Sequence, residues 1–299
     1  LNEGFATYLT GLTNRNFEGE PGFKSWRVDK INSITSQTSG SVYVPAQDTT
    51  DVGRVFSSRL SYNKGSMVLH MLNRQLGEAV FMQGVQAYLA SPNHAYGYAK
   101  TSDFKTIMET ESGTDLSEFF NDWVFDEGYP SYSVAWNRIN DDEIRIVINQ
   151  TQSHNSVSFF EAPVPLKIFG VGGEEIDIVL NNTINGEEFI EPINFDIGLI
   201  VFDADRHLIS KNNTVILGTN DLSIANNISI TPNPAQETIH INKPASVEIE
   251  NIKIYNVLGQ LIKEQKYSET VIISDLTTGL LFIHFETNYG IIHKSLIKR

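Results

Sequence analysis

Few side chains in this 299-residue chain could carry out chemistry. Cysteine is absent, which excludes disulfides, thiol catalysis and zinc held by thiolates. Seven histidines stand at positions 70, 94, 154, 207, 240, 284 and 293. None of them belongs to an H-E-x-x-H motif, which would place two zinc-binding imidazoles on one helix face. His70, within a helical pattern, is expected to be a structural or solvent-facing residue.

Two further candidates open helical patterns. Taken alone, Glu3 is a solvated carboxylate that a helix N-terminus favours. Tyr62 alone is an aromatic at the start of an amphipathic helix, with its ring in the core. Neither residue type is evidence of catalysis without context.

The composition limits the classes of function. Acidic residues number 36 and basic residues 22, a net charge of −14, which argues against a protein that neutralises nucleic-acid phosphates. Hydrophobic residues at 40% and charged residues at 19% describe a folded chain. Apolar runs such as Leu280 to Phe285 are far shorter than a membrane span. We therefore expect no nucleic-acid partner and no transmembrane segment.

The elements needed to position these residues change character along the chain. Residues 1–128 show helical spacing of apolar side chains, interrupted by a polar stretch, Thr13 to Arg59, which we expect to be irregular. The period becomes two in residues 129–218, which predicts a β-sandwich. A polar linker is expected at 219–227, and residues 228–299 read as six short strands of a small β-sandwich. The predicted fold class is therefore multidomain α + β.

The first segment resembles a known family. Residues 1–8 read Leu-Asn-Glu-Gly-Phe-Ala-Thr-Tyr, similar to a segment of the gluzincin zinc aminopeptidases, the family of aminopeptidase N. In that family a Glu in a Leu-x-Glu-Gly-Phe-Ala context is the third zinc ligand, after the two histidines of H-E-x-x-H. The resemblance implies that Glu3 is a metal ligand, in a His₂Glu set that leaves a position open for water.

A second motif supports the same resemblance. Residues 61–72 read Ser-Tyr-Asn-Lys-Gly-Ser-Met-Val-Leu-His-Met-Leu, similar to the family's Tyr-x-Lys-Gly helix. The Tyr of that helix donates a hydrogen bond to the oxyanion of the tetrahedral intermediate. The resemblance therefore implies that Tyr62 is catalytic, and a neutral phenol suits this role because it does not titrate near pH 7.

The resemblance covers residues 1–217 and implies the helical half of a thermolysin-like catalytic domain, followed by the family's β-sandwich. It also implies zinc as cofactor, with the H-E-x-x-H segment expected upstream of Leu1. A single carboxylate binds zinc too weakly to retain it. The piece by itself is therefore expected to be inactive.

The last seventy residues resemble a different family, the C-terminal sorting domain of the type IX secretion system of Bacteroidetes. Three ordered motifs carry this resemblance: Thr231 to Ala235, Ile252 to Leu261 and Leu276 to Leu280, before a basic end at Arg299. The alternative is a generic small β-sandwich that binds carbohydrate or protein. The resemblance implies that residues 228–299 engage the secretion machinery and that the protein is secreted or displayed at the cell surface, through the periplasm and outer membrane.

Together these patterns predict the C-terminal portion of a secreted zinc aminopeptidase, which hydrolyses N-terminal residues from peptide substrates with zinc-activated water. Two alternatives stay open. One is a non-catalytic surface binding protein on the same scaffold, and the other is a related zinc hydrolase with a non-peptide substrate.

Overall fold

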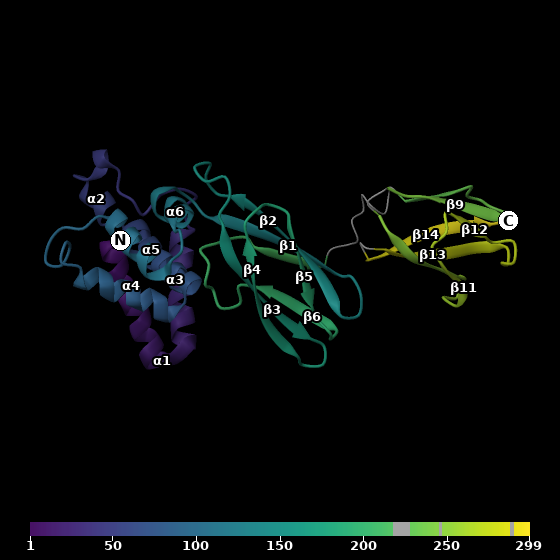
Figure 1. The fold of residues 1–299 in the computed structure, drawn as a ribbon, viewed down its shortest axis with the longest axis horizontal. Helices are drawn as coiled ribbons and strands as arrows, with labels where there is room; N and C mark the ends of the chain where they lie inside the picture. Colours follow the sequence, from purple (N-terminus) through teal and green to yellow (C-terminus); the bar gives the residue numbers. More distant parts are fainter. Residues whose placement is uncertain (218–227, 245–246, 288–289) are drawn as a thin grey trace. The chain divides into compact units, whose positions relative to one another are not determined.

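The structure is a computed structural model that describes residues 1–217, 228–244, 247–287 and 290–299 (Figure 1). The helical elements all fall in the first 125 residues: α1 (Asn2–Ile34), η1 (Ala46–Asp48), α2 (Val52–Val55), η2 (Ser58–Lys64), α3 (Gly65–Leu76), α4 (Glu78–Ala90), α5 (Thr101–Ser112), α6 (Ser117–Phe120) and η3 (Asn121–Phe125). Within the described residues no helix is long and apolar enough to cross a membrane.

Helix α1 corrects one expectation. The stretch from Thr13 was predicted to be irregular, but helix continues to Ile34, with a kink at Gly19 (φ 70°, ψ −166°). Pro21 follows the kink in the first turn of the second half, where a missing N–H costs least. The second half buries a face at helical spacing, made by Phe23, Trp26, Arg27, Ile31 and Ile34. The abundance of polar residues in this stretch concealed that spacing.

A seven-residue π-helical segment, η2, leads directly into α3. It begins after Ser57, whose Oγ accepts a hydrogen bond from the Leu60 N–H at 3.4 Å. π-Helical turns are rare and frequently occur at functional sites. Helix α3 then buries its residues Gly65 to Leu72 and ends at Gly77, a residue with positive φ.

The middle of the chain forms two antiparallel sheets, as the period of two predicts. Their strand orders are β5-β2-β1-β7 and β4-β3-β6. The strands are β1 (Pro130–Arg138), β2 (Glu143–Gln152), β3 (Ala162–Gly170), β4 (Glu175–Asn182), β5 (Glu187–Pro192), β6 (Ile197–Phe202) and β7 (Thr214–Leu217). In β2 the fully buried side chains Ile144, Ile146 and Ile148 alternate with more exposed ones, the pattern of a strand with one face on the core.

The C-terminal part forms two more sheets, β11-β10-β13-β14 and β12-β9-β8. Six of its strands were predicted and are confirmed: β9 (Thr238–Asn242), β10 (Ile249–Tyr255), β11 (Leu261–Lys266), β12 (Thr270–Ile272), β13 (Gly279–Thr287) and β14 (Gly290–Lys298). The short strand β8 (Ser229–Thr231) was not predicted. These sheets enclose an aliphatic core with fully buried Ile239, Ile252, Ile283 and Phe285. The predicted linker, 219–227, lies outside the described residues.

Two motif features of the C-terminal part have a clear structural role. Asn233 lies beside β14: its Nδ2 donates to the Ser295 carbonyl at 2.9 Å, and its Oδ1 accepts from the Ile297 N–H at 2.9 Å. The β10–β11 hairpin turns at Gly259 (φ 75°), where the Asn256 Oδ1 accepts from two backbone N–H groups. A left-handed turn position of this kind favours glycine.

The chain divides into two compact units. The first comprises Leu1–Val134, Val147–Glu187 and Asp196–Val215, and the second comprises Ala135–Ile146, Glu188–Phe195 and Ile216–Arg299. The helices of the described residues, and every site residue discussed below, belong to the first unit. The mixed helical and β class is confirmed, while the predicted domain boundaries 1–128, 129–218 and 228–299 stay predictions.

Candidate active site

The two predicted site residues are brought together by a backbone contact between two glycines. A Cβ built on Gly4 of α1 would lie 2.7 Å from the Gly65 carbonyl carbon, and a Cβ on Gly65 of α3 would lie 3.1 Å from the Gly4 Cα. At Gly4 only a residue without a side chain allows this approach, because a Cβ there would lie within 3.0 Å of a backbone atom, and at Gly65 a Cβ would be in unusually tight contact. The start of α1 therefore packs directly against the junction of η2 and α3.

Glu3 and Tyr62 meet beside this contact. Glu3 precedes Gly4 in the first turn of α1, and Tyr62 lies three residues ahead of Gly65 on η2. Desolvation, and after it the negative charge of Glu3, raises the pKa of the Tyr62 phenol, which indicates that the two side chains lie close to each other. Both side chains are half-buried. Neither matches the expectation for an isolated residue, because Glu3 is not freely solvated and Tyr62 is not a core aromatic.

The residues that follow Tyr62 hold η2 in place. Lys64 is 1% exposed, and its Nζ donates to the Gly40 carbonyl at 3.0 Å and the Asp126 carbonyl at 3.5 Å. Burial, reinforced by the charge of Arg59, lowers the pKa of Lys64 to about 7. The Asn63 Nδ2 donates to the Ser33 Oγ of α1 at 2.9 Å. The two residues that follow Tyr62 are therefore both held by hydrogen bonds to other segments. The sequence patterns did not predict this structural role for Asn63 and Lys64.

The histidines near the site do not join it. His70 is buried on α3, and its Nε2 lies 3.0 Å from Nδ1 of His207, with the two rings stacked at 5.2 Å. Burial lowers the pKa of both imidazoles, to about 3 for His207, so both are neutral at pH 7. Of the two expectations for His70, the structural one holds, and the solvent-facing one is wrong.

The donor set at the site is one carboxylate and one neutral phenol. A carboxylate oxygen is an accepted zinc ligand, and catalytic zinc uses three protein ligands. Among the described residues, no group of three or more His, Cys, Asp or Glu side chains could hold a metal ion. Glu3 thus fits the part of one zinc ligand in a larger set, and Tyr62, a phenol that keeps its proton near pH 7, fits a hydrogen-bond donor beside it.

Comparison with known proteins gives two family matches. Residues 1–123 match the peptidase family M1 domain, and residues 229–299 match the secretion system C-terminal sorting domain. These matches confirm the resemblance to the C-terminal part of an aminopeptidase N-like peptidase followed by a sorting domain. The first match ends at Trp123, in η3, so it contains both Glu3 and Tyr62.

Individual relatives agree with the first match. The tricorn protease-interacting factor F2 of Thermoplasma volcanium is 28% identical over 204 residues, covering 64% of this chain and 24% of the relative. The alanine/arginine aminopeptidase of Saccharomyces cerevisiae is 33% identical over 141 residues, covering 45% of this chain and 16% of the relative. The chain spans about a quarter or less of the length of these relatives.

A solved structure shares the fold. The crystal structure of Legionella pneumophila aminopeptidase A in complex with aspartic acid superposes with a TM-score of 0.56 at 15% identity. The superposition covers 73% of this chain and 24% of that one. At this identity the likeness concerns the fold alone.

Proposed function

We propose that this chain is the C-terminal part of a secreted zinc aminopeptidase, in which Glu3 is a metal ligand and Tyr62 a catalytic hydrogen-bond donor. The observation that carries the proposal is the pairing of Glu3 with Tyr62 across the glycine contact, inside a segment that matches a peptidase domain. The substrates would be peptides with a free N-terminus. The remaining ligands would come from an H-E-x-x-H motif, which this sequence does not contain.

Each residue has a distinct part in the proposed reaction. Zinc, held by Glu3 and the two histidines of the H-E-x-x-H motif, would lower the pKa of a bound water and so supply a nucleophile near neutral pH. The Glu3 carboxylate contributes one oxygen ligand. The Tyr62 hydroxyl donates a hydrogen bond to the substrate oxygen as it gains negative charge. A phenol has an ordinary pKa of about 10, so it keeps its proton near neutral pH and can donate it to the substrate oxygen.

Positioning of Tyr62 follows from its neighbours. The Lys64 and Asn63 side chains bind backbone and side-chain oxygens of three other segments, and the glycine contact fixes the distance between helices. A donor that is already oriented needs no reorganisation when charge develops on the substrate. This arrangement supports an active-site role for Tyr62 better than a packing role, because a half-buried ring contributes less to the core.

For residues 228–299 we propose a role in export by the type IX secretion machinery, which places the protein outside the cell or at its surface. The support is the match over residues 229–299 and the separate aliphatic core of this segment. A segment with its own core can be recognised as a unit.

Zinc content of the intact parent protein tests the metal role. Glu3→Gln should lower the zinc bound per chain and the rate together, and excess zinc should restore part of the rate. The matched control is Asp29→Asn, the same chemical change at an exposed position of the same helix, and it should leave both unchanged. Full zinc occupancy in Glu3→Gln would show that the Glu3 carboxylate is not a zinc ligand. An intact parent protein with no zinc and no turnover on peptides would favour the binding-protein alternative.

A further inference from the structure

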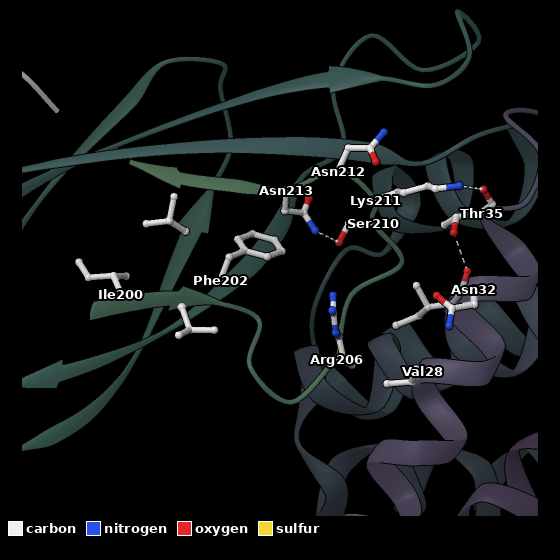
Figure 2. Close-up of a pocket in the computed structure, with 13 residues that line it drawn as sticks. Val28, Asn32, Thr35, Ile200, Phe202, Arg206, Ser210, Lys211, Asn212 and Asn213 are labelled. Carbon is white, nitrogen blue, oxygen red and sulfur yellow. Dashed lines mark hydrogen bonds between the residues drawn. The ribbon is translucent and has the colours of Figure 1, made fainter. Parts of the chain in front are cut away.

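A cavity of about 560 Å³ lies in the first unit, away from Glu3 in sequence and unused by the proposed reaction. Figure 2 shows it between the C-terminal half of α1, strand β6 and the segment that follows β6. Its apolar lining residues include Ile200 and Phe202 on β6 and, across the cavity on α1, Val28. Its polar lining residues include Arg206, Ser210 and Asn213.

Among the described residues that line the cavity, the charges have one sign. Arg206 and Lys211 are both cationic and none of these residues is acidic, although the chain carries a net charge of −14. The Lys211 Nζ donates to the Thr35 carbonyl at 2.9 Å. The Arg206 guanidinium forms no hydrogen bond or ion pair within the described part of the chain, and its charge is one of those that act on the buried Asp203 carboxyl, whose pKa it lowers.

The polar groups at the base of the cavity have protons left to donate. The Asn213 amide is oriented by the Tyr132 N–H, which donates to its Oδ1 at 3.0 Å, so its NH₂ points to the Ser210 Oγ at 2.8 Å. The buried Ser210 hydroxyl already accepts this bond, and no acceptor for its own proton occurs among the residues the structure describes. A hydroxyl that accepts one bond can still donate another. An acceptor is therefore the natural complement of this wall.

The backbone around the cavity is held in an uncommon conformation. Asp203 (φ 41°), Arg206 (φ 59°) and Asn212 (φ 57°) lie in the left-handed region, which non-glycine residues seldom adopt. The Asp203 carboxylate stabilises the loop by accepting from the His207 and Leu208 N–H groups, each at 2.8 Å. Strained backbone of this kind clusters at ligand-binding sites. Here it presents Arg206 to the cavity.

We propose that this cavity binds a small organic carboxylate with an apolar substituent and no neighbouring ammonium group. The guanidinium fork matches a carboxylate in two parallel hydrogen bonds, and the apolar substituent would pack on Ile200 and Phe202. A free amino acid fits less well, because none of the lining residues that the structure describes is acidic and could pair with its ammonium. The ligand is therefore an N-acylated amino acid or the C-terminal end of a peptide, which share this chemistry.

Titration calorimetry on the chain of residues 1–299 tests the proposal with three probes: N-acetyl-L-leucine, N-acetyl-L-leucinamide and L-leucine. The acid should bind at least about tenfold more tightly than the amide, as expected for a charge-assisted hydrogen bond, and more tightly than leucine. An N-acetylated tetrapeptide that ends in leucine separates the two sources. Tighter binding of the peptide assigns the site to peptide C-termini, and weaker binding assigns it to acylated amino acids.

Two variants test whether Arg206 is responsible for the preference for the carboxylate. Arg206→Gln should lower the affinity for N-acetyl-L-leucine to that of the amide, about tenfold or more. Lys24→Gln removes the same charge from a residue that pairs with Asp205 but does not line the cavity, and it should change affinity by less than about threefold. The proposal is overturned if the acid does not bind, if acid and amide bind equally, or if both variants lose affinity alike. Zinc plays no part in these measurements, so their outcome is independent of the proposed peptidase function.

Discussion

Gly4 and Gly65 are in backbone contact: a Cβ on Gly4 would lie 2.7 Å from the Gly65 carbonyl carbon. This contact sets the separation of α1 from the η2–α3 junction, and with it the position of Glu3 relative to Tyr62. The glycines are therefore required for the geometry of the site as well as for packing.

Substitution at this contact should cost stability. Gly4→Ala forces two backbones apart, and overpacking of this kind costs about 1–3 kcal/mol. The loss should appear even though alanine is the better helix former by about 1 kcal/mol. Thermal unfolding checks it, with Gly97→Ala as control, because the nearest atom to a Cβ there is 3.6 Å away. Equal melting temperatures for the two variants would mean that the helices adjust at no cost.

Acid should destabilise the first unit through the buried histidine pair. His70 and His207 have folded-state pKa values below the unfolded value of 6.5. Between these values the unfolded chain binds protons that the folded chain does not, so stability falls as the pH drops below about 6.5. The slope for a fully buried group approaches about 1.4 kcal/mol per pH unit. Urea unfolding at pH 7.5 and pH 5.0 measures the effect.

A variant of this pair provides the control. His207→Gln removes one titrating group and keeps a polar side chain toward His70, so it should reduce the loss of stability between pH 7.5 and pH 5.0. An unchanged loss in this variant would assign the acid sensitivity to other groups.

Lys64 should make stability rise with pH on the alkaline side. Its folded-state pKa is about 7 against 10.5 for the unfolded chain, so between these values the unfolded state binds the extra proton and stability increases with pH. Lys64→Met keeps much of the apolar stem but removes the donors to Gly40 and Asp126. It should abolish this rise and cost about 1–3 kcal/mol at pH 8 for the unpaired carbonyls. Denaturant unfolding from pH 7 to pH 9 measures the free energy of unfolding of the unsubstituted protein and of Lys64→Met. A rise that persists in Lys64→Met would contradict the pKa assigned here.

Removal of residues 228–299 should prevent export of the protein and leave its peptidase activity unchanged. The truncated parent protein is expected to accumulate in the periplasm, with unchanged peptidase activity in cell extracts. This follows from the aliphatic core that these residues form among themselves, which the truncation removes as a whole. Cell fractionation with an activity assay checks both statements. Secretion of the truncated protein would assign the export signal elsewhere, and lost activity would make this segment part of the catalytic unit.

Periodicity was sufficient for most elements of the fold. Strands β9 to β14 were predicted from alternation and turn residues, because each is short and bounded by local signals. The second half of α1 was missed because its buried face is interspersed with polar residues between Gly19 and Ile34. The spacing of Phe23, Trp26 and Ile31 was the available signal.

The site was partly predictable for a similar reason. Glu3 and Tyr62 were predicted as site residues by motif resemblance, and their roles stay predictions, although the charge of Glu3 acts on the Tyr62 phenol. The tertiary features were not accessible: the Gly4–Gly65 contact depends on how two helices cross, and Lys64 has the sequence appearance of a solvated cation. His70 and His207 are 137 positions apart, so no local pattern could pair them.

The most direct test of the account is the turnover number of Tyr62→Phe in the intact parent protein, on an amino-acid anilide. The variant keeps the ring and removes one hydroxyl, so zinc content and KM should change little, while kcat should fall by about 10²–10³-fold for a lost oxyanion donor. Added zinc should restore nothing, in contrast to Glu3→Gln. A near-normal kcat in Tyr62→Phe, with zinc bound, would contradict the catalytic role of Tyr62.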